Sequence, residues 1–196
     1  LDFSNGLGVS TATYGLRLTG KHPLNEDIKF IYAAEAAHQS DYADNTFNIH
    51  ENYVLVEPGL VWNGWTGKAG YEVLHGNGVR AFQTPLATLH IFSGWADKFL
   101  STPARGLKDV YGSLNYKVPF GDKWLKGTDA TVAYHDFDSD AGSVRYGSEW
   151  DASIMQTFFD HYTLGLKVAD YNADRSSVLN TTRDTTKVMT WLQVKY

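Results

Sequence analysis

The C-terminal stretch TTKVMTWLQVKY limits the fold of this chain more than any other segment. Counting back from Tyr196, every second residue is apolar or small, and Lys187, Met189, Trp191, Gln193 and Lys195 fill the positions between. Alternation with a period of two predicts a β-strand. The last residues of soluble domains usually fray, but here the final aromatic residue is in phase with the apolar face. The pattern indicates a last strand that is paired up to its end.

The same alternation recurs along most of the chain and predicts an all-β fold. About eight further segments of roughly ten residues alternate in this way, and they are residues 7–19, 28–39, 53–62, 65–74, 109–118, 130–137, 149–159 and 162–171. The chain also has 12 Tyr and 18 Gly but only 5 Pro, a composition typical of β-proteins. Pro58 interrupts its segment and predicts a bulge or a local break in the ladder. We expect one antiparallel domain over residues 1–196.

Overall composition excludes several classes of protein. No run of about 18 apolar residues is present, which argues against membrane-spanning helices, although a transmembrane barrel hides its apolar face by alternation. The net charge of −5 argues against a nucleic-acid partner, whose binding surface would be basic. The absence of cysteine excludes a disulfide framework, a thiol nucleophile and a Cys-type metal site. Because no signal peptide is visible at LDFSNG, we expect a mature chain, an internal fragment or a cytosolic protein.

The connections between the segments alternate between short and long. Two-residue turns, NG and DH, fall at residues 63–64 and 160–161, and modest links fall at 20–27 and 119–129. The remaining links are longer, and they span residues 40–52, 75–108, 138–148 and 172–186. This sorting is typical of an up-and-down transmembrane β-barrel with tight periplasmic turns and long extracellular loops. About nine strands are visible.

Aromatic residues at the strand ends agree with a membrane barrel. Those beside the short turns lie on the apolar phase: Trp62, Trp65, Tyr116, Phe158, Tyr162 and Tyr196. Such residues would equally cap the core of a soluble β-sandwich, but together with the loop alternation they favour an interfacial girdle. In a membrane the last strand must pair, because lipid offers no water to an open edge.

Part of the sequence is similar to a known family. The stretch GYEVLHGNGVRAFQTPLATLHIFSGWADKFLSTPARGLKDVYGSLNYKV, followed by YHDFDSD and the closing DTTKVMTWLQVKY, resembles the C-terminal part of the alginate-export family of outer-membrane porins. The resemblance implies a channel in a Gram-negative outer membrane, with Tyr196 at the position that the barrel-assembly machinery recognises. Family members are longer, and single-chain bacterial barrels have even strand counts. We therefore expect either the C-terminal portion of a larger barrel or a tenth strand.

If the apolar phase faces lipid, the polar phase lines a pore. The charged and titratable members of that phase are Arg17, Lys29, Glu35, Glu57, Lys68, Glu72, Asp109, Lys117, His135, Glu149, Asp151, Lys167 and Lys187. Cations and anions are nearly balanced, whereas a pore that concentrates an anion should carry a surplus of Arg and Lys. The simplest interpretation of any one of these residues is a solvated lumen side chain that pairs across strands.

The connection at residues 75–108 is too long and too apolar for an ordinary solvated loop. It contains AFQTPLATLHIFSGW, and long loops without structure of their own are usually functional. One hypothesis is that it folds into the barrel or over its mouth and narrows the passage, with Arg80, Gln83, His90 and Lys98 as polar contacts. The competing hypothesis is a lid that packs on neighbouring loops or on a partner subunit.

Motifs for metals and for catalysis are weak. The spacing of Asp136, Asp138 and Asp140 matches the start of a calcium loop, but Ala141 stands at the tight-turn glycine and the twelfth position lacks Glu. Acidic turn residues explain the spacing without a metal. No G-x-S-x-G, HExxH, P-loop or GxGxxG motif is present. We therefore expect neither a cofactor nor an enzyme.

The function that these features favour is an outer-membrane porin. It would allow diffusion or export of a polar solute, with an acidic oligosaccharide as one candidate. Its partners would be membrane lipid, lipopolysaccharide and the assembly machinery that binds the last strand. The alternatives are a soluble all-β carbohydrate-binding module and, with less support, a barrel-borne hydrolase. Exposed Leu16, Val56, Leu114 and Leu166 would support the porin, because a dry two-layer interior would bury them.

Overall fold

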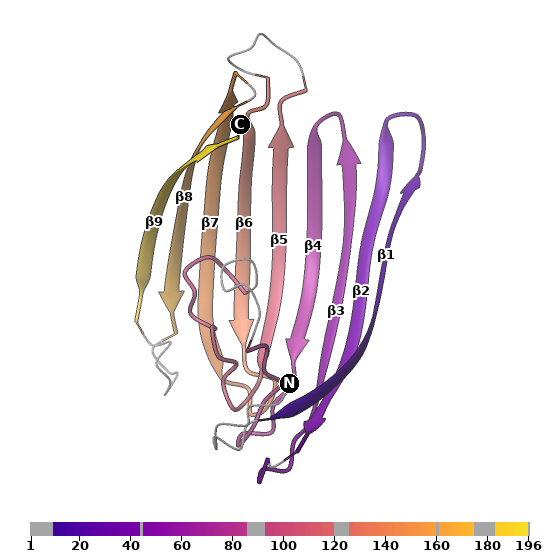
Figure 1. Cartoon of the computed structure of the whole chain (residues 1–196), viewed down its shortest axis with the longest axis vertical. Coiled ribbons are helices and arrows are strands. Elements are labelled where there is room, and N and C mark those ends of the chain that lie inside the picture. The colour runs from indigo at the N-terminus through magenta and orange to yellow at the C-terminus, as the bar shows by residue number, and fades with distance from the viewer. Residues whose placement is uncertain are drawn as a thin grey trace.

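The residues that the structure describes form a single antiparallel sheet of nine strands and the connections between them (Figure 1). The computed structural model describes residues 10–43, 45–85, 93–119, 126–159, 161–174 and 183–195. The strands are β1 (Thr11–Pro23), β2 (Ile28–Asp41), β3 (His50–Trp62), β4 (Trp65–Leu74), β5 (Leu107–Lys117), β6 (Asp129–Asp138), β7 (Arg145–Phe158), β8 (Tyr162–Ala173) and β9 (Thr185–Val194). No helix in this part of the chain could cross a membrane.

Each strand pairs with the strand that follows it in sequence, always antiparallel. The all-β, up-and-down architecture with nine strands is thus confirmed. Within the described residues the sheet stays open, since β1 pairs only with β2 and β9 pairs only with β8. β9 ends at Val194 and Tyr196 lies outside the described residues, so the pairing of the last residue stays a prediction.

Pro58 breaks one ladder without adding a bulge. Between β3 and β4 the paired residues run to Val56 and Tyr71, stop, and resume at Gly59 and Lys68 with the register unchanged. Proline has no N–H to donate, so a local gap at this position is the expected consequence. The register shift that the structure does contain lies between β6 and β7, beside Phe137.

Short and long connections lie at opposite ends of the sheet. Asn63 and Gly64 have φ values of 42° and 83°, the left-handed pair that a two-residue type I′ hairpin requires. The β1–β2 turn at residues 24–27 lies at the same end of the sheet, the upper end in Figure 1. The described residues of the connections at 42–49, 75–106 and 139–144 start from the lower end. The second two-residue turn includes Asp160, which lies outside the described residues.

The two faces of the sheet are sorted in the opposite way to those of a soluble domain. On the outward face Leu16, Val56, Leu114 and Leu166 are 79%, 49%, 44% and 40% exposed. On the inward face carboxylates such as Asp109 are fully buried. Soluble proteins usually bury leucine and only rarely bury a carboxylate completely. The predicted exposure of the apolar phase is therefore confirmed.

The core lies between the inward face and the connection from β4 to β5. Tyr53, Phe137 and Tyr171 reach inward from the sheet and are buried. From the connection, Phe82 stacks on Tyr53 and Phe99 packs against Phe137, with ring centroids 5.6 Å and 4.6 Å apart. In Figure 1 this connection lies in front of the lower parts of β5, β6 and β7. The loop thus provides the second layer that the single sheet lacks.

Candidate functional site

The register places every residue predicted to line the pore on the inward face. Partners that lie directly opposite in adjacent strands point to the same side, and the pairings connect these residues from β1 to β9. The inward set contains Arg17, Lys29, Glu35, Glu57, Lys68, Glu72, Asp109, Lys117, His135, Glu149, Asp151, Lys167 and Lys187. Whether this face borders an aqueous passage stays a prediction.

Only some of these residues pair as solvated lumen charges would. Arg17 Nη1 lies 2.7 Å from Glu35 Oε2, and Lys68 Nζ lies 2.9 Å from Glu57 Oε1. Both pairs are partly solvent-exposed, so each contributes about 0–1 kcal/mol to stability. Lys29 has no ion pair with a described residue.

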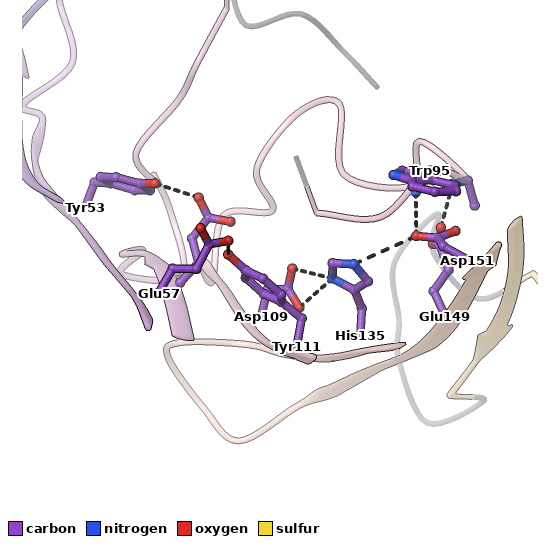
Figure 2. A network of polar contacts seen from close by, with 10 residues as sticks. Tyr53, Glu57, Trp95, Asp109, Tyr111, His135, Glu149 and Asp151 are labelled. Atoms are coloured by element: carbon purple, nitrogen blue, oxygen red, sulfur yellow. Dashed lines mark hydrogen bonds and ion pairs between the residues drawn. The ribbon is translucent and has the colours of Figure 1, made fainter. Parts of the chain in front are cut away.

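Tyrosines that sequence reasoning did not select as site residues hold two of the inward carboxylates (Figure 2). Tyr53 Oη donates to Glu72 Oε1 over 2.7 Å, and Tyr111 Oη donates to Glu57 Oε2 over 2.6 Å. Both tyrosines lie on the polar phase of their strands. A large aromatic residue on the polar phase was the available signal, because a tyrosine there needs a partner for its hydroxyl.

His135 connects two buried carboxylates on the same face. Its Nδ1 lies 2.8 Å from Asp109 Oδ2 and its Nε2 lies 3.8 Å from Asp151 Oδ2. The ring stacks between Tyr111 and Phe137, with centroids at 5.2 Å and 5.5 Å. Both ring nitrogens therefore face carboxylates and not a hydroxyl nucleophile, which is not the geometry of a hydrolytic triad.

The first part of the loop is attached to β1 and β2 through Gln39. Gln39 Nε2 donates to the Gln83 carbonyl over 2.9 Å and to Thr13 Oγ1 over 3.0 Å. In return, the Gln83 amide donates to Gln39 Oε1 over 2.9 Å. Gln39 is almost fully buried, so these bonds satisfy a side chain that would otherwise be costly in that position. Gln83, a predicted contact residue, therefore contacts the sheet through its backbone.

The second part of the loop is attached to β7 by two backbone amides. The Ala96 N–H donates to Glu149 Oε1 over 2.7 Å, and the Trp95 N–H donates to Asp151 Oδ2 over 3.3 Å (Figure 2). Glu149 and Asp151 are both fully buried beneath this segment. Two predicted pore-lining residues thus serve here as anchors for the loop.

The loop also reaches β8, where Lys167 Nζ lies 4.7 Å from the ring centroid of Trp95, and β9. Lys187 forms an ion pair with Asp97, and Lys98 Nζ donates to the Arg183 carbonyl and to Thr185 Oγ1, each over 3.0 Å. Burial lowers the pKa of the Lys98 ammonium. Together with the contacts through Gln39 described above, these contacts attach the loop near both edges of the sheet, the β1–β2 edge and the β8–β9 edge.

The predicted loop contacts differ in where they lie. Gln83 and Lys98 contact the inward face, whereas the guanidinium of Arg80 lies 3.5 Å from the ring centroid of Phe47 in the neighbouring 42–49 connection. His90 lies outside the described residues. The described parts of the loop therefore pack on the inward face and also contact both neighbouring connections. Arg80 reaches the 42–49 connection, and the Arg105 carbonyl accepts from the Ala141 N–H in the 139–144 connection over 2.8 Å.

The acidic triplet near the β6–β7 connection is divided between different partners. Asp136 forms an ion pair with Arg145, and Asp140 Oδ2 lies 2.9 Å from His75 Nδ1. Asp138 pairs through its backbone at the register shift between β6 and β7. In the described ranges no three His, Cys, Asp or Glu residues gather in a way that could hold a metal ion.

Aromatic residues cluster beside the short turns on the outward face. Trp62 lies opposite Trp65, and the Trp65 ring lies 4.4 Å from that of Tyr116. Phe158 lies opposite Tyr162 at the next short turn. Trp62, Trp65 and Tyr162 are exposed, as expected of side chains in a membrane interface. Tyr196, the remaining predicted member, lies outside the described residues.

At Gly94 the loop approaches Glu149 closely. A substitution at this glycine therefore tests the attachment of the loop to β7. A Cβ at Gly94 would lie 2.6 Å from Glu149 Oε2, whereas a Cβ at Gly78 would meet nothing within 4 Å. Both glycines have positive φ, so Gly94→Ala and Gly78→Ala share a backbone cost of about 1 kcal/mol. Only Gly94→Ala should displace the anchor. We expect faster hydrogen exchange at residues 93–99 in that variant alone, and equal exchange in both would contradict the attachment.

Comparison with known proteins identifies the class of fold. No family model matches the chain, and no curated protein matches it. The crystal structure of Pseudomonas aeruginosa OccK5 (OpdH) is similar, with a TM-score of 0.67 and 12% identity. The match covers 95% of this chain and 51% of that one, so the chain spans about half the length of that protein.

The fold is that of a porin-type β-barrel. At this level of identity the similarity establishes the fold alone. The resemblance to the alginate-export family stays a prediction, since no family model matches.

Proposed function

We propose that this chain forms part of the wall of an outer-membrane channel for polar solutes. The observation that carries the proposal is the reversed sorting of the sheet, in which leucines such as Leu16 are exposed and acids such as Asp109 are buried. A sheet of this kind gains free energy when hydrocarbon covers its outward face and water or polar groups cover its inward face. The similarity to OccK5 in fold supports the same proposal.

The nature of the solute is a finer proposal. The exposed ion pairs Arg17–Glu35 and Lys68–Glu57 supply charges of both signs on the inward face, which suits a polar and hydrated solute. An acidic oligosaccharide is supported by the alginate-export resemblance. It is not supported by a surplus of Arg and Lys, which an anion-selective pore would need.

The proposed surroundings follow from the outward face. The exposed aromatic residues Trp62, Trp65 and Tyr162 would lie at the headgroup level. We propose an outer membrane with lipopolysaccharide on the long-loop side, and recognition of the last strand by the assembly machinery.

Reconstitution of the complete protein in planar lipid bilayers tests the proposal. We expect detergent-dependent solubility and discrete single-channel current steps in neutral salt. A protein that stays monomeric and soluble without detergent, and produces no current steps, would instead be the soluble binding module. Solubility and current are measured on one preparation. A sample that needs detergent but gives no current is misfolded, whereas a soluble monomer without current contradicts the proposal.

A further inference from the structure

Glu149 and Asp151 form a buried pair that the proposed channel does not by itself explain. They are two residues apart on β7, so they project from the same inward face, and they are 0% and 1% exposed. Each uses one oxygen to accept a loop amide, from Ala96 and Trp95 respectively. The other oxygens, Glu149 Oε2 and Asp151 Oδ1, have no hydrogen-bond partner among the described residues. Figure 2 places the two carboxyl groups side by side beneath Trp95.

Most of the charged groups around the pair are engaged elsewhere. From β5 and β6, Asp109 and His135 Nδ1 bind each other, which leaves His135 Nε2 3.8 Å from Asp151. From the loop, Lys98 donates to Arg183 and Thr185. From β8 and β9, Lys167 lies over the rings of Trp95 and Trp191, Lys187 pairs with Asp97, and the Tyr171 hydroxyl donates to the Tyr146 carbonyl. Among the described residues, only His135 lies within ion-pair distance of Asp151, and no cation lies within ion-pair distance of Glu149.

Two neighbouring ionised carboxylates are unfavourable in a buried site when at most one of them has a cation nearby. They repel each other, and every buried oxygen without a hydrogen bond adds a further cost. One proton removes both problems. A protonated carboxyl group donates one O–H, so a single proton between the two residues reduces the charge by one and gives both orphan oxygens a partner.

We propose that Glu149 and Asp151 bind one shared proton, and that the protonated pair is a latch that holds residues 93–99 against the inward face. The proposal rests on the proposed channel function and adds to it a regulating ligand, the proton. It assigns the pair a role beyond that of lumen lining.

The direction of the response follows from the charges. When the shared proton is present, the pair carries one negative charge and both loop amides stay bound. Loss of the proton strengthens each amide-to-carboxylate bond. It also places a second unpaired charge in the buried site, and this cost is the larger of the two. The latch therefore opens as the pH rises, and the ratio of closed to open falls by up to about tenfold per pH unit when one proton is released.

Single-cysteine labelling measures the latch without relying on channel activity. The described sequence has no cysteine, so Ala96→Cys, at a site only 7% exposed, reports on opening. Val79→Cys, at a site 75% exposed, provides the reference. The complete protein in lipid vesicles is labelled with a thiol-reactive polyethylene glycol maleimide between about pH 5 and about pH 9. The thiol itself reacts faster as the pH rises, and dividing the Ala96→Cys labelling rate by the Val79→Cys rate removes this effect. We expect the ratio to rise with pH by at least about tenfold.

Isosteric variants of Glu149 and Asp151 show whether the latch depends on the shared proton or only on the shape of the two side chains. In Glu149→Gln the side-chain carbonyl still accepts from Ala96, and the amide permanently donates to Asp151. This variant should keep the labelling ratio low at every pH, and Asp151→Asn should do the same if Glu149→Gln folds poorly. Glu72→Gln is the matched control, because Glu72 is also buried but its partner is Tyr53 and not the loop backbone. It should keep the response of the parent protein.

Each outcome decides the proposal. A flat ratio in the parent protein, or an unchanged pH response in both isosteric variants, would overturn it. So would a response that appears only with calcium and disappears with a chelator, since the ligand would then be a metal ion. Current recordings on the same variants complete the test. A protein that gives no current but shows the expected labelling would refute the channel and retain the latch. A protein that gives current but has a labelling ratio independent of pH would refute the latch and retain the channel.

Discussion

Replacing residues 82–99 by a short Gly/Ser linker is expected to raise single-channel conductance by about threefold, because the described residues of this segment pack on the inward side of the sheet. The described part of this segment is attached to β2 through Gln83 and to β7 through Ala96. In the proposed channel, ions would pass through the space that this segment leaves, and the linker would widen it. Planar bilayer recordings at one salt concentration measure the change directly.

Two controls make this result interpretable. Replacing the β1–β2 turn, residues 24–27, with the same linker alters the opposite end of the sheet and should leave conductance unchanged. A variant that keeps Phe82 and Phe99 and replaces only residues 84–98 retains both aromatic contacts to the core. Full burial of a phenylalanine contributes about 1.5–3 kcal/mol, and Phe82 is buried while Phe99 is half-buried. Keeping both residues therefore separates lost stability from a wider passage. Unchanged conductance in both loop variants would favour the lid that packs on neighbouring loops.

The strands and their two faces could be predicted because the signal is local. Side chains in a strand alternate sides, so a run of ten residues already records which side is apolar. The segment at residues 65–74 coincides with β4 for this reason. The β6–β7 boundary was predicted less well. The register shift beside Phe137 interrupts the period, and Tyr146, fully buried at the start of β7, fell outside the predicted segment.

The loop contacts could not be predicted because they join residues that are far apart in sequence. Gln39 and Gln83 are separated by 44 positions, and Ala96 and Glu149 by 53. No local pattern records such a pair. The sequence did indicate that an apolar run in the loop needs a surface to cover it. It could not indicate that Glu149 and Asp151 would be buried as anchors, because the alternating sequence pattern of a strand is the same for a buried carboxylate and for a solvated one.

Introducing arginine on the outward face should destabilise the protein far more than introducing it on the inward face. Ile154 and Met155 are consecutive in β7, so their depth in a membrane is nearly equal while their side chains point to opposite faces. Ile154 is 49% exposed and lies four residues from Phe158, a member of the predicted aromatic girdle. In the proposed membrane this spacing places Ile154 about 10 Å from the interface when strand tilt is included. Ile154→Arg should cost about 2–4 kcal/mol of unfolding free energy.

Met155→Arg should change the unfolding free energy by less than about 1 kcal/mol, because lumen positions tolerate charge and this one faces Asp129 across the ladder. Urea titration of both variants folded into phospholipid vesicles measures the difference. The comparison also separates the two main functional hypotheses. In a soluble module a half-exposed Ile154 would accept arginine within about 0.5 kcal/mol, so two equally mild variants would remove the basis for a membrane channel. A large cost confined to Ile154→Arg requires hydrocarbon against the outward face, since water imposes no such penalty on a guanidinium.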